Sequence, residues 1–353
     1  MDIKDASVAR TPQIPLDPDN LPFGRNFCPN MFLVEWEHGK GWRDARIEPY
    51  GPLPLPPSAM VFHYGQEIFE GLKAFRHADG GIGMFRPDRN AGRLNQSAKR
   101  MSMPEIPVEL QLEAMRRLVR IDKAWVPKPP GTLYIRPAMI ATEAGLGVHS
   151  SKQFLYFIIT GPTGSYFGPD KSAVRIMVAR EWVRAAPGGT GSAKTGGNYA
   201  ASLLASAVAK EKGCDQVLWL DAVERRHVEE VGAMNLMFVF DGVVTTPPTS
   251  GTILAGITRE SLAILCKELR LPYVERAIHI EEVLNGLRNG DCTEIFGCGT
   301  AAVVSPVSEI LDGDTIYPVG NGDEGPAARK LREALNSIQF GTAPDKHGWM
   351  MRV

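Results

Sequence analysis

Apolar positions follow strand-like spacing in some segments of the chain and helical spacing in others. Six short apolar runs predict strands, at Met31–Trp36, Ile82–Phe85, Leu133–Ile140, Phe154–Thr160, Val174–Val178 and Gln216–Leu220. Helical spacing or a high alanine content predicts helices at Asn90–Met101, Pro107–Trp125, Asn198–Lys212 and Thr258–Leu269. Thr258 is the predicted N-cap of the last helix, and Asp241-Gly242 predicts a hairpin within Met237–Val244. Because strands and helices do not alternate regularly, the pattern predicts an α+β fold rather than a doubly wound sheet.

The length of 353 residues favours two domains that share a cleft. A loop rich in Gly, Pro and Ser, from Gly161 to about Ser172, is the best candidate for the connection between them. We therefore predict a small N-terminal α+β domain at 1–163, a linker at 164–174 and a large C-terminal domain at 175–353. Frequent prolines predict that the first domain begins with an irregular arm that reaches to about residue 60.

Composition excludes several classes of protein. The chain is 44% apolar and 22% charged, as in an ordinary globular protein, and its net charge of −1 argues against nucleic acid or an anionic membrane as a partner. The N-terminus has no apolar stretch typical of a signal peptide, and no run of apolar residues is long enough to span a bilayer. Five scattered cysteines without a C-x-x-C pair predict neither a disulfide framework nor a metal site, and we expect a cytoplasmic protein.

The segment Gly188–Tyr199 surrounds Lys194 with glycines and is the densest chemical signal. One interpretation is a phosphate-binding P-loop of a nucleotide-binding protein, but Ala193 occupies the position where that motif needs glycine. A second is a surface turn with a solvated lysine. A third is a lysine that forms a Schiff base with an aldehyde cofactor, because a partly buried, glycine-walled site favours the neutral amine. The segment alone leaves all three open.

A pyridoxal 5'-phosphate (PLP) site needs an anion site for the phosphate and a carboxylate for the ring nitrogen. Gly256, Ile257 and Thr258 precede a predicted helix, whose free N–H groups would bind a phosphate. Glu230 follows Glu229 in an apolar setting and is the candidate partner of the pyridine nitrogen. The alternative for these two glutamates is a solvated pair on a turn.

The chain contains several sequence segments that occur in the same order in one protein family. They are HYGQEIFEGLKAF (63–75), FRPDRNAGRLNQSA (85–98), LYIRP (133–137), GPTGSYF (161–167), GGTGSAKTGGNYAASL (188–203), EEVGAMNLMFV (229–239), TILAGITRESL (252–262) and FGCGTAAVVSPV (296–307). In these blocks the chain resembles the branched-chain aminotransferases, which are PLP enzymes of fold type IV. The resemblance implies a two-domain α+β fold like that of D-amino acid aminotransferase, with the active site at the domain interface.

The resemblance also implies a role for individual residues. Lys194 would carry PLP as a Schiff base, Tyr199 would donate to the ring oxygen and Glu230 would pair with the ring nitrogen. The implied phosphate ligands are Arg93, Ile257, Thr258 and Thr300. The implied carboxylate ligands of the substrate are Thr300, Ala301, Tyr64 and Arg136. The implied side-chain pocket consists of Phe23, Phe69, Tyr134 and Tyr166, with Leu146 and Val148 donated by a neighbouring subunit of a homodimer. For single aromatic residues, ordinary core packing is the alternative.

The implied reaction is ping-pong transamination from Leu, Ile or Val to 2-oxoglutarate, which gives glutamate and 2-oxo acids. An apolar pocket discriminates weakly between side chains that differ by one methylene, so all three amino acids should be accepted. The rivals of the same fold are a D-amino acid aminotransferase and an aminodeoxychorismate lyase. Vertebrate members carry a C-x-x-C pair where this chain has Ala302 and Ser305, so their thiol switch should be absent, and Cys298 is expected to be inert.

Overall fold

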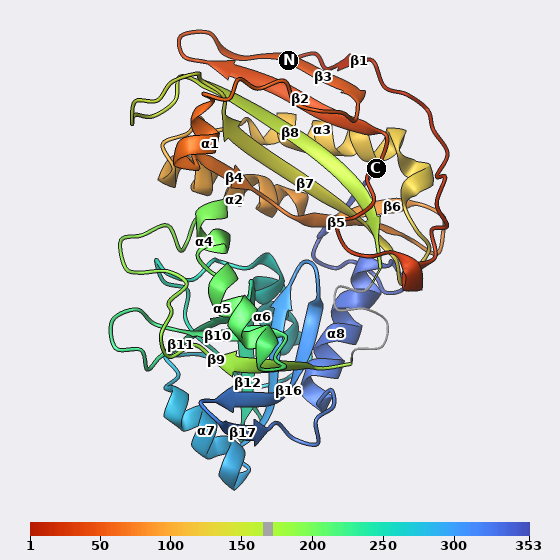
Figure 1. Cartoon of the computed structure of the whole chain (residues 1–353). Helices are drawn as coiled ribbons and strands as arrows, with labels where there is room; N and C mark the ends of the chain where they lie inside the picture. Colours follow the sequence, from red (N-terminus) through yellow and green to blue (C-terminus); the bar gives the residue numbers. More distant parts are fainter. Residues whose placement is uncertain (165–171) are drawn as a thin grey trace. The chain divides into compact units, whose positions relative to one another are not determined.

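A computed structural model describes residues 1–164 and 172–353 and separates the chain into two compact units (Figure 1). Unit 1 comprises Met1–Pro169, Ala193–Gly196 and Ser337–Val353, and unit 2 comprises Asp170–Ser192 and Gly197–Asn336. Neither unit is a continuous stretch, because a four-residue segment around Lys194 and the C-terminal tail both belong to unit 1. The domain boundaries at 163 and 175 stay a prediction, since most of the expected linker lies outside the described residues.

Unit 1 is built on one large sheet in which all pairs are antiparallel except β1 with β3. The strand order is β1-β3-β2-β8-β7-β5-β6-β18, and β4 also pairs with β7. The strands are β1 Lys4–Asp5, β2 Asn30–Glu37, β3 Gly41–Pro49, β4 Glu67–Phe69, β5 Leu72–Arg76, β6 Ile82–Phe85, β7 Thr132–Ala141, β8 Gln153–Thr163 and β18 Met350–Arg352. The C-terminal strand β18 completes the edge beside β6, which explains why the end of the chain belongs to unit 1.

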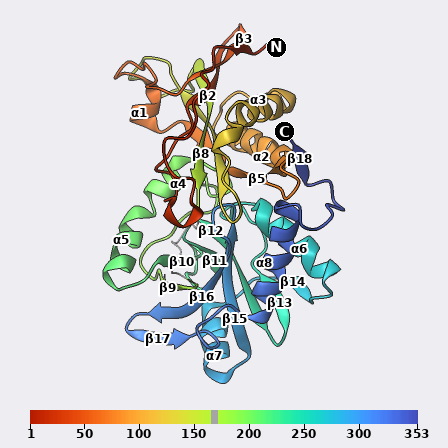
Figure 2. The same ribbon diagram turned by 90° about the vertical axis from the view of Figure 1, so that its right-hand side faces the viewer.

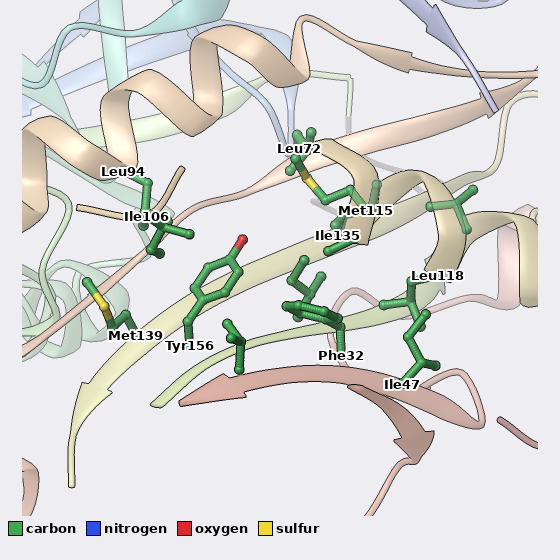
Figure 3. Close-up of a cluster of buried hydrophobic side chains, with 14 of the residues drawn as sticks. Phe32, Ile47, Leu72, Leu94, Ile106, Met115, Leu118, Ile135, Met139 and Tyr156 are labelled. Atoms are coloured by element: carbon green, nitrogen blue, oxygen red, sulfur yellow. The ribbon is translucent and has the colours of Figure 1, made fainter. Parts of the chain in front are cut away.

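Helices cover one face of this sheet and form the core with it. The helices of unit 1 are α1 Met60–Tyr64, α2 Pro87–Arg100 and α3 Val108–Ile121, with short 3-10 turns η1 Pro18–Asn20 and η2 Lys123–Trp125. Figure 3 shows Leu94 and Leu118 pointing toward apolar side chains of the strands, among them Ile135 of β7. Because strand residues alternate between faces, the two neighbours of Ile135, Tyr134 and Arg136, lie on the opposite face.

The prediction of an irregular N-terminal arm is wrong between residues 30 and 49, where β2 and β3 form a hairpin. Met31–Trp36 was expected as a strand, but β3 was not expected at all. Pro29 precedes this hairpin, and Pro49 is the last residue of β3, opposite Asn30, so neither proline interrupts the paired interior.

Unit 2 contains a second sheet whose main ring is closed. The order is β11-β10-β9-β16-β15-β12-β13-β14, β17 pairs with β16, and an additional pairing of β11 with β12 closes a barrel-like ring. The strands are β9 Val174–Val178, β10 Gln216–Leu220, β11 Val228–Val231, β12 Met234–Phe240, β13 Val243–Thr246, β14 Tyr273–Glu275, β15 Cys292–Gly299, β16 Val303–Asp312 and β17 Thr315–Pro318. The predicted hairpin at Asp241-Gly242 is confirmed, since both residues have the positive φ that such a turn requires.

The remaining helices lie after residue 195. They are α4 Gly196–Ala200, α5 Leu203–Glu211, α6 Ile257–Glu268, α7 Ile280–Asn289 and α8 Pro326–Gln339. In unit 2, α5 contacts β10, while α6 and α7 contact β15 (Figure 2). Across the described ranges, no helix combines the length and the apolar character needed to cross a membrane.

Two predicted helices differ from the observed ones. The single helix expected at Asn198–Lys212 is divided into α4 and α5, because the hydroxyl of Ser202 donates to the carbonyl oxygen of Tyr199 at 2.6 Å and the chain turns there. The predicted N-cap at Thr258 is also wrong. The N-cap of α6 is Gly256, which has no side chain to cap the helix, and Thr258 lies within the first turn.

Candidate active site

The open face of the unit 1 sheet gathers three of the predicted pocket residues around Arg136, a predicted ligand of the substrate carboxylate. The guanidinium carbon of Arg136 lies 4.7 Å from the ring centroid of Phe69 and 5.3 Å from that of Tyr134. Its Nη2 donates to the Tyr134 hydroxyl at 3.1 Å. Phe23 packs edge-on against Tyr134, with ring centroids 4.8 Å apart. The arrangement is a cation held within an aromatic wall, so simple core packing does not describe these aromatic residues.

One nitrogen of this cation remains without an acceptor. Among the residues that the structure describes, Nε of Arg136 is buried and makes no hydrogen bond. A buried guanidinium N–H without an acceptor is costly, and a carboxylate is the acceptor that matches the geometry of the group. The site therefore fits a carboxylate ligand whose remaining atoms contact aromatic rings.

Gly71 makes room for the tyrosine in this group. A Cβ atom at Gly71 would overlap the Tyr134 hydroxyl oxygen. Only glycine at this position lets the hydroxyl take its place beside Arg136.

Lys194 is fixed to unit 1 through the backbone on both sides of its side chain. Its N–H donates to Oγ of Ser97 at 2.9 Å, and its carbonyl accepts from the N–H of Phe69 at 3.0 Å. The hydroxyl of Thr195 donates to the carbonyl of Glu67 at 2.7 Å. Nζ of Lys194 lies 4.8 Å from the Phe69 ring centroid, so the lysine and Arg136 share one aromatic neighbour.

Both alternatives for the Lys194 segment conflict with this arrangement. Ala193 and Thr195 are buried, so the lysine does not lie on a solvated surface turn. A P-loop connects a strand directly to the helix that carries its lysine. Here β9 ends at Val178, well before Gly188, and Lys194 precedes a helix of only five residues.

Arg93, the predicted phosphate ligand, is held by a glutamate that sequence reasoning did not single out. The Nε and Nη2 atoms of Arg93 donate to Glu70 at 2.7 and 2.9 Å, and Asn90 donates to the same carboxylate at 2.8 Å. Glu70 is fully buried. Burial alone would raise the pKa of Glu70, but the attraction and hydrogen bonds of Arg93 lower it below its ordinary value. The only sequence signal for Glu70 is its place beside Gly71 in the 63–75 block.

We expect Glu70→Ala to lower the free energy of unfolding by about 3–5 kcal/mol, because it leaves the buried guanidinium of Arg93 without its carboxylate. Chemical denaturation monitored by fluorescence measures the change. Glu113→Ala is the matched control, since Glu113 pairs with Arg116 and Arg117 on an open helix surface. Such a pair contributes only about 0–1 kcal/mol. Equal losses in the two variants would contradict the role of Glu70.

In unit 2 the candidate ring partner Glu230 lies buried in β11 and is oriented by three groups. Nε of Arg184 lies 2.8 Å from one carboxylate oxygen. The amide of Asn235 and the N–H of Leu254 donate to the other, at 3.2 and 3.0 Å. Glu229 is also buried and accepts from the hydroxyl of Thr252. The alternative of a solvated pair on a turn is wrong, because both glutamates belong to an inner strand of the closed ring.

The start of α6 is an uncapped helix N-terminus next to Glu230's partner Asn235. The N-cap Gly256 supplies no side-chain cap, no side-chain cap hydrogen bond is present among the described residues, and both Ile257 and Thr258 are buried. A Cβ atom at Gly256 would overlap Oδ1 of Asn235, so this close approach requires glycine. Asn235 thus contacts both the glutamate and the helix start and sets their spacing within unit 2. Uncapped N–H groups and the positive helix end fit a phosphate.

Sequence reasoning missed Asn235 and Arg184, although both lie in the quoted blocks or next to them. The guanidinium of Arg184 also donates to the carbonyl oxygens of Gly191 at 3.2 Å and of Thr252. It therefore connects the glycine-rich loop of unit 2 to Glu230. The sequence signal that could have identified Arg184 is its position just before the glycine-rich loop.

The other predicted site residues are placed as follows. Tyr199 lies in α4, and Thr300 and Ala301 lie in the turn between β15 and β16 of unit 2. In unit 1, Tyr64 ends α1 and its hydroxyl donates to the carbonyl of Leu146. Leu146 and Val148 are 68% and 85% exposed. Tyr166 lies outside the described residues.

Cys298 is buried in β15. Burial raises the pKa of its thiol to about 12, so the reactive thiolate is scarce at neutral pH.

Comparison with known proteins supports one family. A model of class IV amino-transferases matches residues 67–310. Branched-chain-amino-acid transaminase 1 of Bacillus subtilis (strain 168) is 51% identical over 340 residues, which cover 96% of this chain and 95% of that protein. The structure of a branched-chain amino acid aminotransferase from Thermobaculum terrenum in its PLP form has a TM-score of 0.77 and 25% identity, and the match covers 93% and 99% of the two chains. The structure of the branched-chain amino acid aminotransferase from Escherichia coli has a TM-score of 0.72 and 27% identity, with coverage of 90% and 98%.

Proposed function

Because the chain belongs to the class IV aminotransferase family, we propose that it is a PLP-dependent transaminase of branched-chain amino acids. It transfers the amino group of Leu, Ile or Val to 2-oxoglutarate and releases the 2-oxo acid and glutamate. The observation that carries the proposal concerns Arg136, whose buried Nε has no hydrogen-bond partner among the described residues. It lies inside an aromatic wall that also contacts the Lys194 amine. A carboxylate, an apolar side chain and an amino group are the three features of a branched-chain amino acid.

The two units contain groups that fit PLP. The uncapped start of α6 and Arg93 suit its phosphate, and Lys194 suits its aldehyde. Glu230 suits its ring nitrogen, because two hydrogen-bond donors and an ion pair with Arg184 already orient this carboxylate. When bound, PLP supplies an aldehyde that carries the amino group and a ring that withdraws electrons from the substrate's Cα.

Each residue then has a defined task. Lys194 would hold the cofactor covalently at rest; once released by the incoming amine, its Nζ would take the proton from the substrate's Cα and give it to the carbon that had been the cofactor's aldehyde carbon. Glu230 keeps a proton on the ring nitrogen. Tyr199 donates to the ring oxygen, and the hydroxyl of Thr300 joins the phosphate ligands. The N–H groups of Thr300 and Ala301, with Tyr64 and Arg136, bind the substrate carboxylate.

The aromatic residues around Arg136 form the proposed pocket for the substrate side chain. Phe23, Phe69 and Tyr134 offer rigid area to side chains that have no polar group to bind, and Tyr166 belongs to the same proposed wall. The exposed Leu146 and Val148 suit donation to the site of a second copy, so we propose a homodimer. Free, buried cysteines suit a reducing compartment, and we propose the cytoplasm.

A steady-state panel on the purified protein with PLP and 2-oxoglutarate tests the proposed function. L-Leu, L-Ile and L-Val should all be substrates, with kcat/KM values within about a hundredfold of one another, because one methylene changes binding by only ~1–3 kcal/mol. D-Alanine is the comparison substrate for the rival D-amino acid aminotransferase. A preference for D-alanine, or no turnover of all three branched-chain amino acids, would contradict the proposal.

A further inference from the structure

A second carboxylate, Glu67, lies on the same sheet face as Arg136. Glu67 begins β4 and pairs with Ile140 of β7, while Phe69 pairs with Ala138. Residues two apart on a strand share a face, so Glu67, Phe69 and Arg136 all lie on the face that carries the aromatic wall. The proposed mechanism gives Glu67 no task.

The backbone N–H of Gly196 fixes the Glu67 carboxylate by donating to its Oε1. A Cβ at Gly196 would overlap this oxygen, so glycine is needed for the approach. The contact ties the side chain of Glu67 to the segment that carries Lys194, and the hydroxyl of Thr195 binds the carbonyl of the same residue. Glu67 is therefore held beside the substrate-facing groups rather than extended into solvent.

The charge of Glu67 acts on Arg136 without a direct ion pair. Within the described part of the chain, no carboxylate oxygen of Glu67 lies within ion-pair distance of Arg136, yet the guanidinium stabilises the charged form of Glu67. Burial, the larger influence, raises the pKa of Glu67, and the Gly196 N–H and Arg136 oppose that rise. The face thus carries a positive centre at Arg136 and a fixed carboxylate at Glu67, and the two groups are of opposite charge.

The proposed reaction places two substrates of different charge against this face. Branched-chain substrates have a neutral side chain, whereas glutamate and 2-oxoglutarate carry an additional carboxylate. Both classes carry the carboxylate that Arg136 is proposed to bind, so a fixed negative charge acts on that contact in the same way for both. Only the dicarboxylate brings a second negative charge to the face, so it is disfavoured further. We propose that Glu67 is a specificity-determining residue that weakens binding of the dicarboxylate substrate relative to the branched-chain substrate. This inference rests on the proposed function and adds a residue that sets the balance between the two half-reactions.

Binding of two unreactive analogues to the PLP-loaded enzyme tests this proposal. Glutarate has the second carboxylate, and 4-methylvalerate has the branched apolar end. Glu67→Gln removes the charge while its amide oxygen still accepts from Gly196. We expect the ratio of the inhibition constant of 4-methylvalerate to that of glutarate to rise about three- to tenfold in this variant, because one unit charge is removed from a half-buried site.

Further variants separate charge from shape. Glu67→Ser is a second uncharged variant and should shift the ratio in the same direction, whereas Glu67→Asp keeps the charge and should leave the ratio near that of the wild type. Glu113→Gln controls for loss of an exposed carboxylate of unit 1 and should leave the ratio unchanged. A wild-type ratio in both uncharged variants, or an equal shift in the Asp and Gln variants, overturns the proposal. If the wild type transaminates none of the branched-chain amino acids, the proposed function itself fails, whatever the ratio.

Discussion

Lys194→Ala should lower transaminase turnover by about a thousandfold or more, because it removes both the covalent attachment of the cofactor and the base that moves the substrate proton. The variant should still fold. The contacts that place this residue use its backbone N–H and carbonyl, which alanine retains. The protein should also lose the visible absorbance that covalently attached PLP gives the wild type.

Two measurements make this prediction specific to position 194. Borohydride reduction of the wild type followed by peptide mapping should find the cofactor on Lys194. Lys99→Ala is the matched control, since Lys99 is an exposed lysine at the end of α2, and it should keep wild-type turnover. Near-normal activity of Lys194→Ala, or a label on another lysine, would refute the assignment.

Glu230→Gln should bind PLP but slow the first half-reaction by about 10²–10³-fold, because a neutral amide no longer holds a proton on the ring nitrogen. Single-turnover absorbance measurements with L-leucine follow this step directly. The substitution also removes the charged partner of Arg184, whose Nε lies 2.8 Å from the carboxylate. The unfolding transition must therefore be measured in parallel, so that a lower rate caused by partial unfolding is distinguished from one caused by loss of the proton on the ring nitrogen.

The neighbouring glutamate provides the control for this prediction. Glu229 is buried in the same strand but points to the opposite face, where it accepts from Thr252. Glu229→Gln should slow the half-reaction much less, by about tenfold at most, because Glu229 lies on the face of β11 opposite to that of Glu230. An unchanged half-reaction rate in Glu230→Gln, or equal losses in both variants, would contradict the role of Glu230.

Much of the fold was predictable where local pattern and tertiary packing agree. The apolar runs Leu133–Ile140 and Phe154–Thr160 predicted β7 and β8, and one face of each of these strands is buried in the core. The sharp turn at Asp241-Gly242 was equally clear. The strand β3 was missed, since it carries charged residues on its open face and has few apolar ones on the other. The predicted N-cap of α6 was two residues too late. The prediction chose Thr258 because threonine side chains often cap helices, whereas the observed N-cap is a glycine.

The amino-acid sequence by itself determined the family and the cofactor, and it singled out Lys194 as the candidate for the reactive amine, because these depend on residue types and spacing within short blocks. Only the tertiary structure revealed which groups hold those residues. Glu70 binds Arg93, Asn235 joins Glu230 to the start of α6, and Glu67 contacts the Lys194 segment from a distant strand. The physical reason is that a sequence motif contains only residues that are neighbours along the chain. Ion pairs and hydrogen bonds, in contrast, also form between residues that are distant in sequence and that only folding brings together.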